Sequence, residues 1–430
     1  MQIFLKFIFL MMLCSFSLSS NVDAFFEADL DENNLFAEDL IMQAPKDNFT
    51  DLYNEQKSVN LTGQFQFDSN YSINRDWMQG KGAFADNKLR TYTHGDFYLD
   101  IRLKKDIKAF LDLGIANVSS KISTDNSSTS LADIKELFVD FNIERKIYMR
   151  IGKQYLQWGR NYFWNPVDLV NIERKNFLNL NASLAGTYGT RLYLPFGAGQ
   201  NLYFFANSNE ANNLDKFALV TKYEFLAGDT EYGLSMWTKK GKTPVYAVDF
   251  STNKINWDIT GEISFSKGST FTRMEIEKGS LVTKSITDKL VAKAALNLSH
   301  SFKWEKANRI NFSYEIFYNG AGYSENIFKN KEKKEYLFHT NLYIPNHHAQ
   351  LYHACFFSIA DFPYRYTKFS LNGIQNLVDY SGIISTGLSY QITHGFEVAT
   401  KLAVYFGDDN SEFMNDGYGL AVHFYSKIIF

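Results

Sequence analysis

Charged residues of both signs gather in one stretch of the chain and on the segments beside it. Residues 158–185 carry Arg160, Asp168, Glu173, Arg174 and Lys175, and the flanking segments add Arg150 and Arg191. Opposed charges across a narrow, water-filled passage would set up a transverse field that selects among ions and polar solutes. We therefore predict a pore constriction or selectivity site formed by Arg150, Arg160, Asp168, Glu173, Arg174 and Arg191.

The eight histidines offer no recognisable catalytic or metal-binding pattern. They are His94, His300, His339, His347, His348, His353, His394 and His423. None belongs to a G-x-S-x-G nucleophile turn or to an H-E-x-x-H zinc motif. The pair His347-His348 follows Pro345 and is interpreted as a polar tight turn. We predict no catalytic residue, no metal and no cofactor, and hence no enzyme.

Period-two alternation dominates the chain from residue 58 onward, and it predicts the strands that must position these charges. Val59, Leu61, Phe65 and Phe67 alternate with polar residues, and the pattern returns at 255–265 and 310–318. Each strand thus has one apolar and one polar face. Charges stand in the middle of the polar faces, but alternation of this kind also fits a soluble sandwich.

The expected connections favour a barrel. We predict strands at 58–68, 90–104, 107–118, 133–143, 146–157, 186–195, 199–207, 214–226, 229–238, 244–252, 254–266, 288–300, 308–319, 334–345, 349–360, 379–391, 394–407 and 417–430. Tight turns and long loops then mostly alternate, as in bacterial outer-membrane barrels. The fold class is therefore all-β, an antiparallel transmembrane β-barrel of about eighteen strands, with sixteen to twenty allowed by further strand-like segments near 271–276 and 364–371.

The polar faces of these strands define the expected lumen. They carry charges of mixed sign, which argues against strong ion selectivity: Asp100, Arg102, Asp112, Glu136, Asp140, Arg150, Lys222, Glu224, Asp258, Glu262, Lys293, Glu315, Glu397 and Lys401. About eighteen strands leave a water-filled lumen, whereas about eight would be filled by side chains. The strand count therefore favours transport.

Composition agrees with a membrane barrel. Aromatic residues make up 17% of the chain, there are only 6 prolines, and the net charge of −3 suggests no nucleic-acid partner. No segment after the N-terminal run has the roughly 20 consecutive apolar residues of a spanning helix. Aromatic girdles around a polar interior account for a chain that is rich in rings and yet polar on average.

The two ends of the chain predict export and membrane insertion. Residues 1–24 have the basic start, short apolar run and small residues of a cleaved signal peptide. Residues 25–57 form an acidic periplasmic or lumenal leader, and residues 58–430 form the barrel. The last predicted strand ends with Phe430 on its apolar face. A terminal aromatic residue resembles the signal by which outer-membrane barrels are handed to the barrel-insertion machinery.

The stretch from Gly152 to Asp168 resembles the G-[KR]-Q-x3-W-G-x5-N-P-x-D motif of porin-like outer-membrane β-barrel proteins, most of unassigned substrate. Gly152, Gln154, Trp158, Gly159, Asn165, Pro166 and Asp168 match it. On a structural interpretation, Trp158-Gly159 ends a strand, Asn165-Pro166 makes a turn, and Asp168 caps the segment after that turn. On the functional one, the 158–185 loop folds inward and narrows the lumen. Both remain open at this point.

We therefore predict a porin-like channel of the cell outer membrane for passive or facilitated diffusion of small solutes. Its other partners would be outer-membrane lipids, and the sequence leaves open whether barrels form a homotrimer. The alternatives are a surface-exposed structural or adhesive barrel and an outer-membrane enzyme. A TonB-dependent transporter is disfavoured because only residues 25–57 precede the first strand, too few for a plug domain.

Overall fold

The computed structural model describes residues 58–103, 106–118, 132–170, 175–180, 184–197, 199–209, 211, 213, 216–268, 272–277, 280–304 and 308–430. The expected signal peptide 1–24 and leader 25–57 lie outside these residues, so both stay predictions. Within the described residues, no helix is long and apolar enough to cross a membrane.

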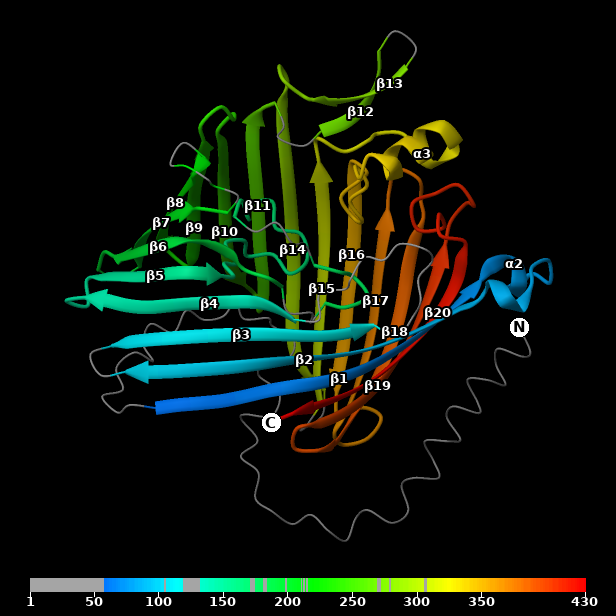
Figure 1. Ribbon diagram of the computed structural model, residues 1–430, viewed down its shortest axis with the longest axis horizontal. Coiled ribbons are helices and arrows are strands. Elements are labelled where there is room, and N and C mark those ends of the chain that lie inside the picture. Colours follow the sequence, from blue (N-terminus) through cyan, green and yellow to red (C-terminus); the bar gives the residue numbers. More distant parts are fainter. Residues whose placement is uncertain are drawn as a thin grey trace. The chain divides into compact units, whose positions relative to one another are not determined.

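Eighteen antiparallel strands form one closed sheet (Figure 1). In chain order they are β1 (Ser58–Asn74), β2 (Lys88–Leu103), β3 (Ile107–Val118), β4 (Ala132–Ile143), β5 (Ile147–Gln154), β6 (Thr187–Pro195), β7 (Gln200–Asn207), β8 (Ala218–Ala227), β9 (Thr230–Lys239), β10 (Val245–Lys254), β11 (Trp257–Lys267), β14 (Leu290–Trp304), β15 (Asn308–Asn319), β16 (Leu351–Ala360), β17 (Thr367–Asn376), β18 (Gly382–Thr393), β19 (Phe396–Phe406) and β20 (Tyr418–Ile429). Each strand pairs with its neighbours in this order, and β20 pairs with β1. The predicted antiparallel barrel is confirmed.

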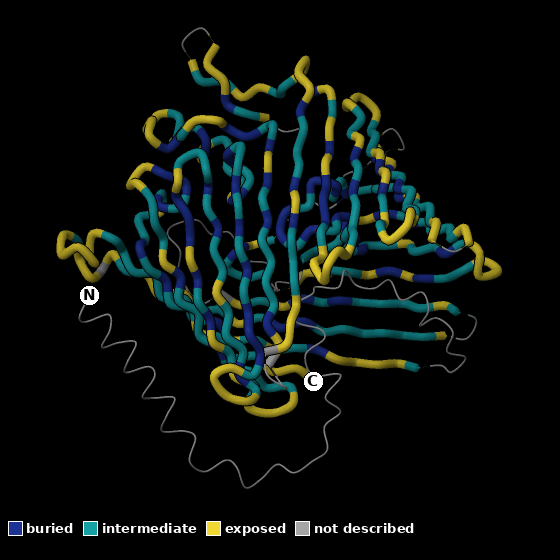
Figure 2. Tube along the Cα trace, turned by 180° about the vertical axis from the view of Figure 1, so that it is seen from behind, coloured by how far each residue is buried: buried dark blue, intermediate teal, exposed yellow. Residues whose placement is uncertain are grey.

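The two faces of the barrel wall differ as the alternation predicts. Apolar side chains lie on the outside, where Val59 is 68% and Leu61 is 64% exposed. Charged side chains point inward and are buried, including Asp68, Asp249 and Glu315 at 0% exposure. Buried positions recur along the strands, while the turns are exposed (Figure 2). An apolar exterior around a polar interior is the reverse of a soluble barrel and fits a lipid environment.

The predicted strand count was right although one predicted strand was wrong. Residues 334–345 do not form a strand, because 334–339 belong to the helix α3 (Lys331–His339). The Asn330 side chain caps this helix by accepting the Lys333 N–H at 3.0 Å. The missing strand is β17, which overlaps the further strand-like segment noted near 364–371. The two errors cancel in the count but change which connections are long.

Long connections and short turns lie at opposite ends of the strands. The connection 320–350 between β15 and β16 is long and holds η4 (Ile327–Lys329) and α3. The turn expected at His347 is present, since the His347 N–H donates to the Ile344 carbonyl at 3.2 Å, but it does not join two strands directly. The connection between β11 and β14 carries a hairpin outside the barrel, β12 (Thr272–Glu277) and β13 (Ser280–Ser285). The connection between β1 and β2 holds α2 (Arg75–Met78) and η2 (Phe84–Asp86).

The C-terminus completes the closure of the barrel. Phe430 N–H donates to the Gly63 carbonyl at 2.9 Å, and Gly63 N–H donates to the Phe430 carbonyl at 2.8 Å. The Phe430 ring lies over Gly63 and stacks on Phe65, with ring centroids 5.6 Å apart. A Cβ on Gly63 would lie 2.7 Å from both the Phe430 ring and the Asp96 carbonyl.

Gly63→Val is therefore expected to displace the Phe430 ring and to destabilise the barrel by about 1–3 kcal/mol, the usual effect of overpacking. Urea unfolding of the refolded protein, followed by tryptophan fluorescence, measures this difference. Gly373→Val is the matched control, because Gly373 lies in β17 and a Cβ there meets nothing within 4 Å. Equal stability of the two variants would contradict a closing role for the Gly63–Phe430 pairing.

Candidate functional site

Residues 155–186, between β5 and β6, form what we name the crossing loop. Its described parts bond to side chains that point into the barrel from strands far along the sheet. The Tyr162 ring of the loop contacts the Phe356 ring of β16. Counted around the sheet, β16 is the ninth strand after β5. In a ring of eighteen strands the ninth is the one directly opposite. The crossing loop therefore extends from one wall of the lumen to the other.

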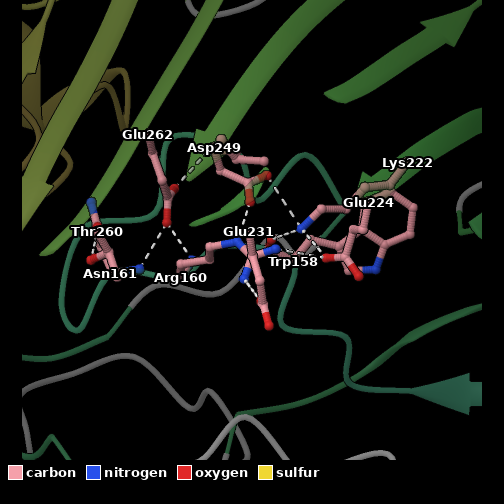
Figure 3. A network of polar contacts seen from close by, with 10 residues as sticks. Trp158, Arg160, Asn161, Lys222, Glu224, Glu231, Asp249, Thr260 and Glu262 are labelled. Atoms are coloured by element: carbon pink, nitrogen blue, oxygen red, sulfur yellow. Dashed lines mark hydrogen bonds and ion pairs between the residues drawn. The ribbon is translucent and has the colours of Figure 1, made fainter. Parts of the chain in front are cut away.

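Arg160 joins the crossing loop to three acidic side chains of the wall (Figure 3). Its guanidinium bonds to Asp249 of β10, to Glu231 of β9 at 2.6 Å and to Glu224 of β8 at 3.3 Å. Burial by itself would lower the pKa of Arg160, but the charges of Asp249 and Glu224 hold it above its ordinary value. Arg160 is therefore permanently charged and tied to the wall.

Lys222 of β8 supports the same cluster. Its ammonium group donates to the Trp158 carbonyl at 2.8 Å and lies 3.0 Å from Glu224 and 3.3 Å from Asp249. Asp249 has no exposed surface and contacts both cations, so its charge is compensated inside the barrel.

Glu262 of β11 holds the next part of the loop through its backbone. The carboxylate accepts N–H groups from Arg160 at 2.5 Å, Asn161 at 2.8 Å and Val167 at 3.1 Å. The neighbouring Thr260 hydroxyl donates to the Asn161 side-chain oxygen at 2.6 Å. Charge-assisted bonds of this kind are about twice as strong as neutral ones. Glu262 therefore fixes the path of the loop through backbone N–H groups, whatever side chains the loop carries there.

Glu315 of β15 holds the loop a few residues further on in the same way. It accepts the N–H groups of Phe163 at 2.9 Å and Trp164 at 2.5 Å. The Trp164 ring stacks on Phe317 of the same strand, with centroids 5.4 Å apart, and its indole N–H donates to the Asn346 carbonyl at 3.0 Å. Trp164 is completely buried by these contacts.

The later part of the loop packs as an apolar layer inside the barrel. Phe163 and Phe177 lie against Phe356 of β16, with ring centroids 5.9 and 6.0 Å apart. The same cluster extends to inward-facing apolar residues of β17 to β20, namely Ile374, Ile383, Ala403 and Ala421. Part of the lumen cross-section is thus occupied by protein.

This burial shifts the pKa values of two titratable groups of the loop. Burial lowers the pKa of Lys175, although the charges of Glu315, Glu262 and Asp168 act in the opposite direction. The Lys175 ammonium group donates to the Tyr162 carbonyl. Burial, together with the Glu315 charge, raises the pKa of Tyr162 to about 12. Tyr162 therefore stays neutral at any physiological pH.

Comparison with known proteins identifies solved structures with a similar fold. No family model and no curated protein matches the chain. Among solved structures, the chain is similar to OccAB1 of Acinetobacter baumannii, with 11% identity, 86% of this chain and 96% of that chain covered, and a TM-score of 0.52. It is also similar to OccK9 of Pseudomonas aeruginosa, with 10% identity, 87% and 99% covered, and a TM-score of 0.50.

The motif residues shape the entry to the crossing loop. Gly152 has a φ of 135°, and a Cβ there would collide with the Leu137 carbonyl. Gly159 faces the Asn165 side chain, which a Cβ would also collide with. The Gln154 amide donates to the Gly189 carbonyl at 3.2 Å. Trp158-Gly159 does not end the strand, since β5 already ends at Gln154.

The turn at Asn165-Pro166 matches its structural interpretation. Asp168 N–H donates to the Asn165 carbonyl at 3.1 Å, across the buried Pro166. The Asp168 carboxylate accepts the Val170 N–H at 3.3 Å, which is the local capping role expected of it.

The predicted constriction residues lie at different places on the wall and the loop. Arg160 bonds to Asp249, Glu231 and Glu224, and the constriction formed with Arg150, Asp168, Glu173, Arg174 and Arg191 stays a prediction. Arg150 bonds to Asp140 at 2.6 and 2.8 Å and lies over the Phe138 ring, 3.8 Å from its centroid. Arg191 is buried in β6 opposite Arg150.

Two predicted site residues, Glu173 and Arg174, lie outside the described part of the chain. The acceptors that hold the crossing loop were missed as site residues, although the mid-strand charges Glu262 and Glu315 were expected in the lumen. Their position in alternating strands is the only signal that the sequence offers. No feature of the sequence near Glu262 or Glu315 indicates that their partners are backbone N–H groups about 100 to 150 residues away.

Proposed function

We propose that this chain is a channel of the cell outer membrane that lets small solutes diffuse passively through an eighteen-stranded barrel, with the crossing loop narrowing its lumen. The observation that carries the proposal is the crossing loop itself, bonded to inward-facing carboxylates from β8 to β15. A loop held inside a polar lumen limits solute size and places charge along the path. The fold shared with OccAB1 and OccK9 is compatible with this function.

The proposed location is supported by the apolar outer face and by the chain ends. Lipid-facing residues, the expected signal peptide and the terminal Phe430 all fit insertion into an outer membrane by the barrel-insertion machinery. Outer-membrane lipids and the diffusing solute would then be the partners.

A second candidate is a structural barrel with exposed rim loops, and one observation favours it. The apolar layer of Phe163, Phe177 and Phe356 fills part of the lumen and continues to β20. If the remaining space passes no ions, the barrel would serve as a surface scaffold.

Single-channel recording from the refolded mature chain in a planar lipid bilayer distinguishes the two. The channel proposal predicts steady conductance steps smaller than those of an open eighteen-stranded pore. The fraction of folded barrel is checked beforehand by its heat-modifiable gel mobility. Folded protein that produces no steps at any voltage would reject the channel and support the scaffold.

A further inference from the structure

Glu412 is a buried carboxylate at the rim from which the long connections arise. It lies in the connection 407–417 between β19 and β20 and is 3% exposed. One carboxylate oxygen accepts the Asn346 N–H at 3.1 Å and faces the Tyr343 hydroxyl at 3.5 Å. The other accepts the Tyr352 hydroxyl at 2.7 Å and the Asn376 side-chain amide at 2.8 Å.

These donors come from separate parts of the barrel. Tyr343 and Asn346 belong to the connection 320–350, Tyr352 to β16 and Asn376 to the end of β17. The Glu412 N–H adds a bond of 2.8 Å to the Asp379 carboxylate in the turn before β18. A single residue therefore ties three rim connections to two strands.

The same residues reach the crossing loop by two short routes. Asn346 donates its N–H to Glu412 and accepts the Trp164 indole N–H with its carbonyl, at 3.1 and 3.0 Å. Tyr352 donates its hydroxyl to Glu412, and its ring lies 6.0 Å from the Trp164 ring. One residue thus separates Glu412 from Trp164 along each route.

We propose that Glu412 is a positioning residue for the crossing loop: through Asn346 and Tyr352 it holds Trp164, and it does so differently when its carboxyl group is protonated and when it is charged. The effect on conductance rests on the proposed function. The effect on the position of Trp164 does not.

The electrostatic setting gives the direction of the pH dependence. Burial raises the pKa of Glu412 to about 7, the Asp379 charge adds to this, and the bonds from Tyr352, Asn346 and Asn376 oppose it. Because this pKa lies above the value of 4.5 for the exposed group, the carboxyl stabilises the closed rim fully below about pH 4.5. That contribution is lost as the pH rises through about 7. The equilibrium between closed and loosened rim should shift by up to about two orders of magnitude.

Other titratable groups surround Glu412, and Glu315 contacts the crossing loop at the Trp164 N–H. Burial and the Glu412 charge raise the pKa of Tyr343 far above its ordinary value. His348, whose ring lies 5.7 Å from that of Tyr343, has its pKa lowered to about 4 by burial. The remaining titratable neighbours are Tyr352 of β16, Asp379 in the turn before β18, and Asp416 in the connection 407–417 that also holds Glu412.

The test observes Trp164 directly, by fluorine NMR of the refolded chain labelled with 5-fluorotryptophan in lipid nanodiscs. Trp164→Phe assigns the resonance. In the wild type we expect it to change between pH 5.5 and 8.5 with a midpoint near 7. Glu412→Gln should abolish the change because it cannot titrate, and Glu412→Asp should restore it with a shifted midpoint. Glu332→Gln, on the exposed part of α3, is the control and should behave as the wild type.

A parallel recording of current noise separates the two proposals. We expect noise to rise with pH in the wild type and to be independent of pH in Glu412→Gln. A Trp164 resonance that is constant over the range, or that titrates equally in Glu412→Gln, would overturn the role of Glu412. Absence of current with a normal Trp164 titration would reject the channel and leave the positioning role intact.

Discussion

Replacing Glu262 and Glu315 together by alanine is expected to release the crossing loop from the wall and to raise both the mean conductance and the current noise. Five backbone N–H groups, those of residues 160, 161, 163, 164 and 167, lose their acceptors. Each buried N–H left unpaired costs about 1–3 kcal/mol. The loop can recover much of this only by moving into water, which widens the passage.

The matched control removes two lumenal carboxylates that have no bond to the described part of the crossing loop. Asp258 of β11 accepts a bond from Asn253, and Glu397 of β19 contacts Lys427 and Tyr425. Asp258→Ala with Glu397→Ala removes the same number of lumenal carboxyl groups and should leave the noise as in the wild type. Equal conductance and noise in both double variants would mean that the apolar layer alone positions the loop.

The barrel could be predicted from the sequence because each strand carries its own evidence. Alternation sorts residues such as Leu61 and Asp68 to opposite faces, and lipid outside and water inside enforce that sorting along every strand. The connections were less certain. Tyr336, Phe338 and Thr340 alternate with other residues in a strand-like pattern, but the Asn330 cap and a run of good helix formers favour α3 instead.

The types of residue in the site could be predicted from the sequence, but not which of them contact one another. A charged loop long enough to enter the lumen is visible in the sequence, and so are carboxylates on lumenal faces. Which of them meet depends on strand order, tilt and stagger around the whole ring, since Arg160 and Asp249 are 89 residues apart in the chain. A local irregularity adds to this: a register shift beside Asp112 skips Lys135, which then bonds to the inward-facing Asp96.

Glu412 illustrates the same limit. In the sequence it is one acidic residue among several in a polar connection, and nothing distinguishes it from Asp408 or Asp409. Its role emerges only when Asn346, Tyr352 and Asn376 are brought around it by the closure of the barrel.

Arg160→Ala is expected to shift the ion preference of the channel toward cations and to loosen the crossing loop. The substitution removes the guanidinium that bonds to Asp249, Glu224 and Glu231, while Lys222 stays in place. Removing one partner of a buried ion pair costs about 3–5 kcal/mol. Most of that cost arises at Asp249, which is fully buried, and little at Glu231, whose side chain is 61% exposed.

The reversal potential in a potassium chloride gradient measures this shift, with Arg102→Ala as the control. Arg102 pairs with Asp100 at 3.3 Å near the end of β2, eight strands away from β10 and its Asp249, so its loss should change the potential less. Arg160→Met combined with Asp249→Asn removes one charge of each sign and should return the potential toward that of the wild type. If Arg102→Ala and Arg160→Ala shift it equally, the cations act only through the net charge of the lumen, and the crossing loop does not set the selectivity.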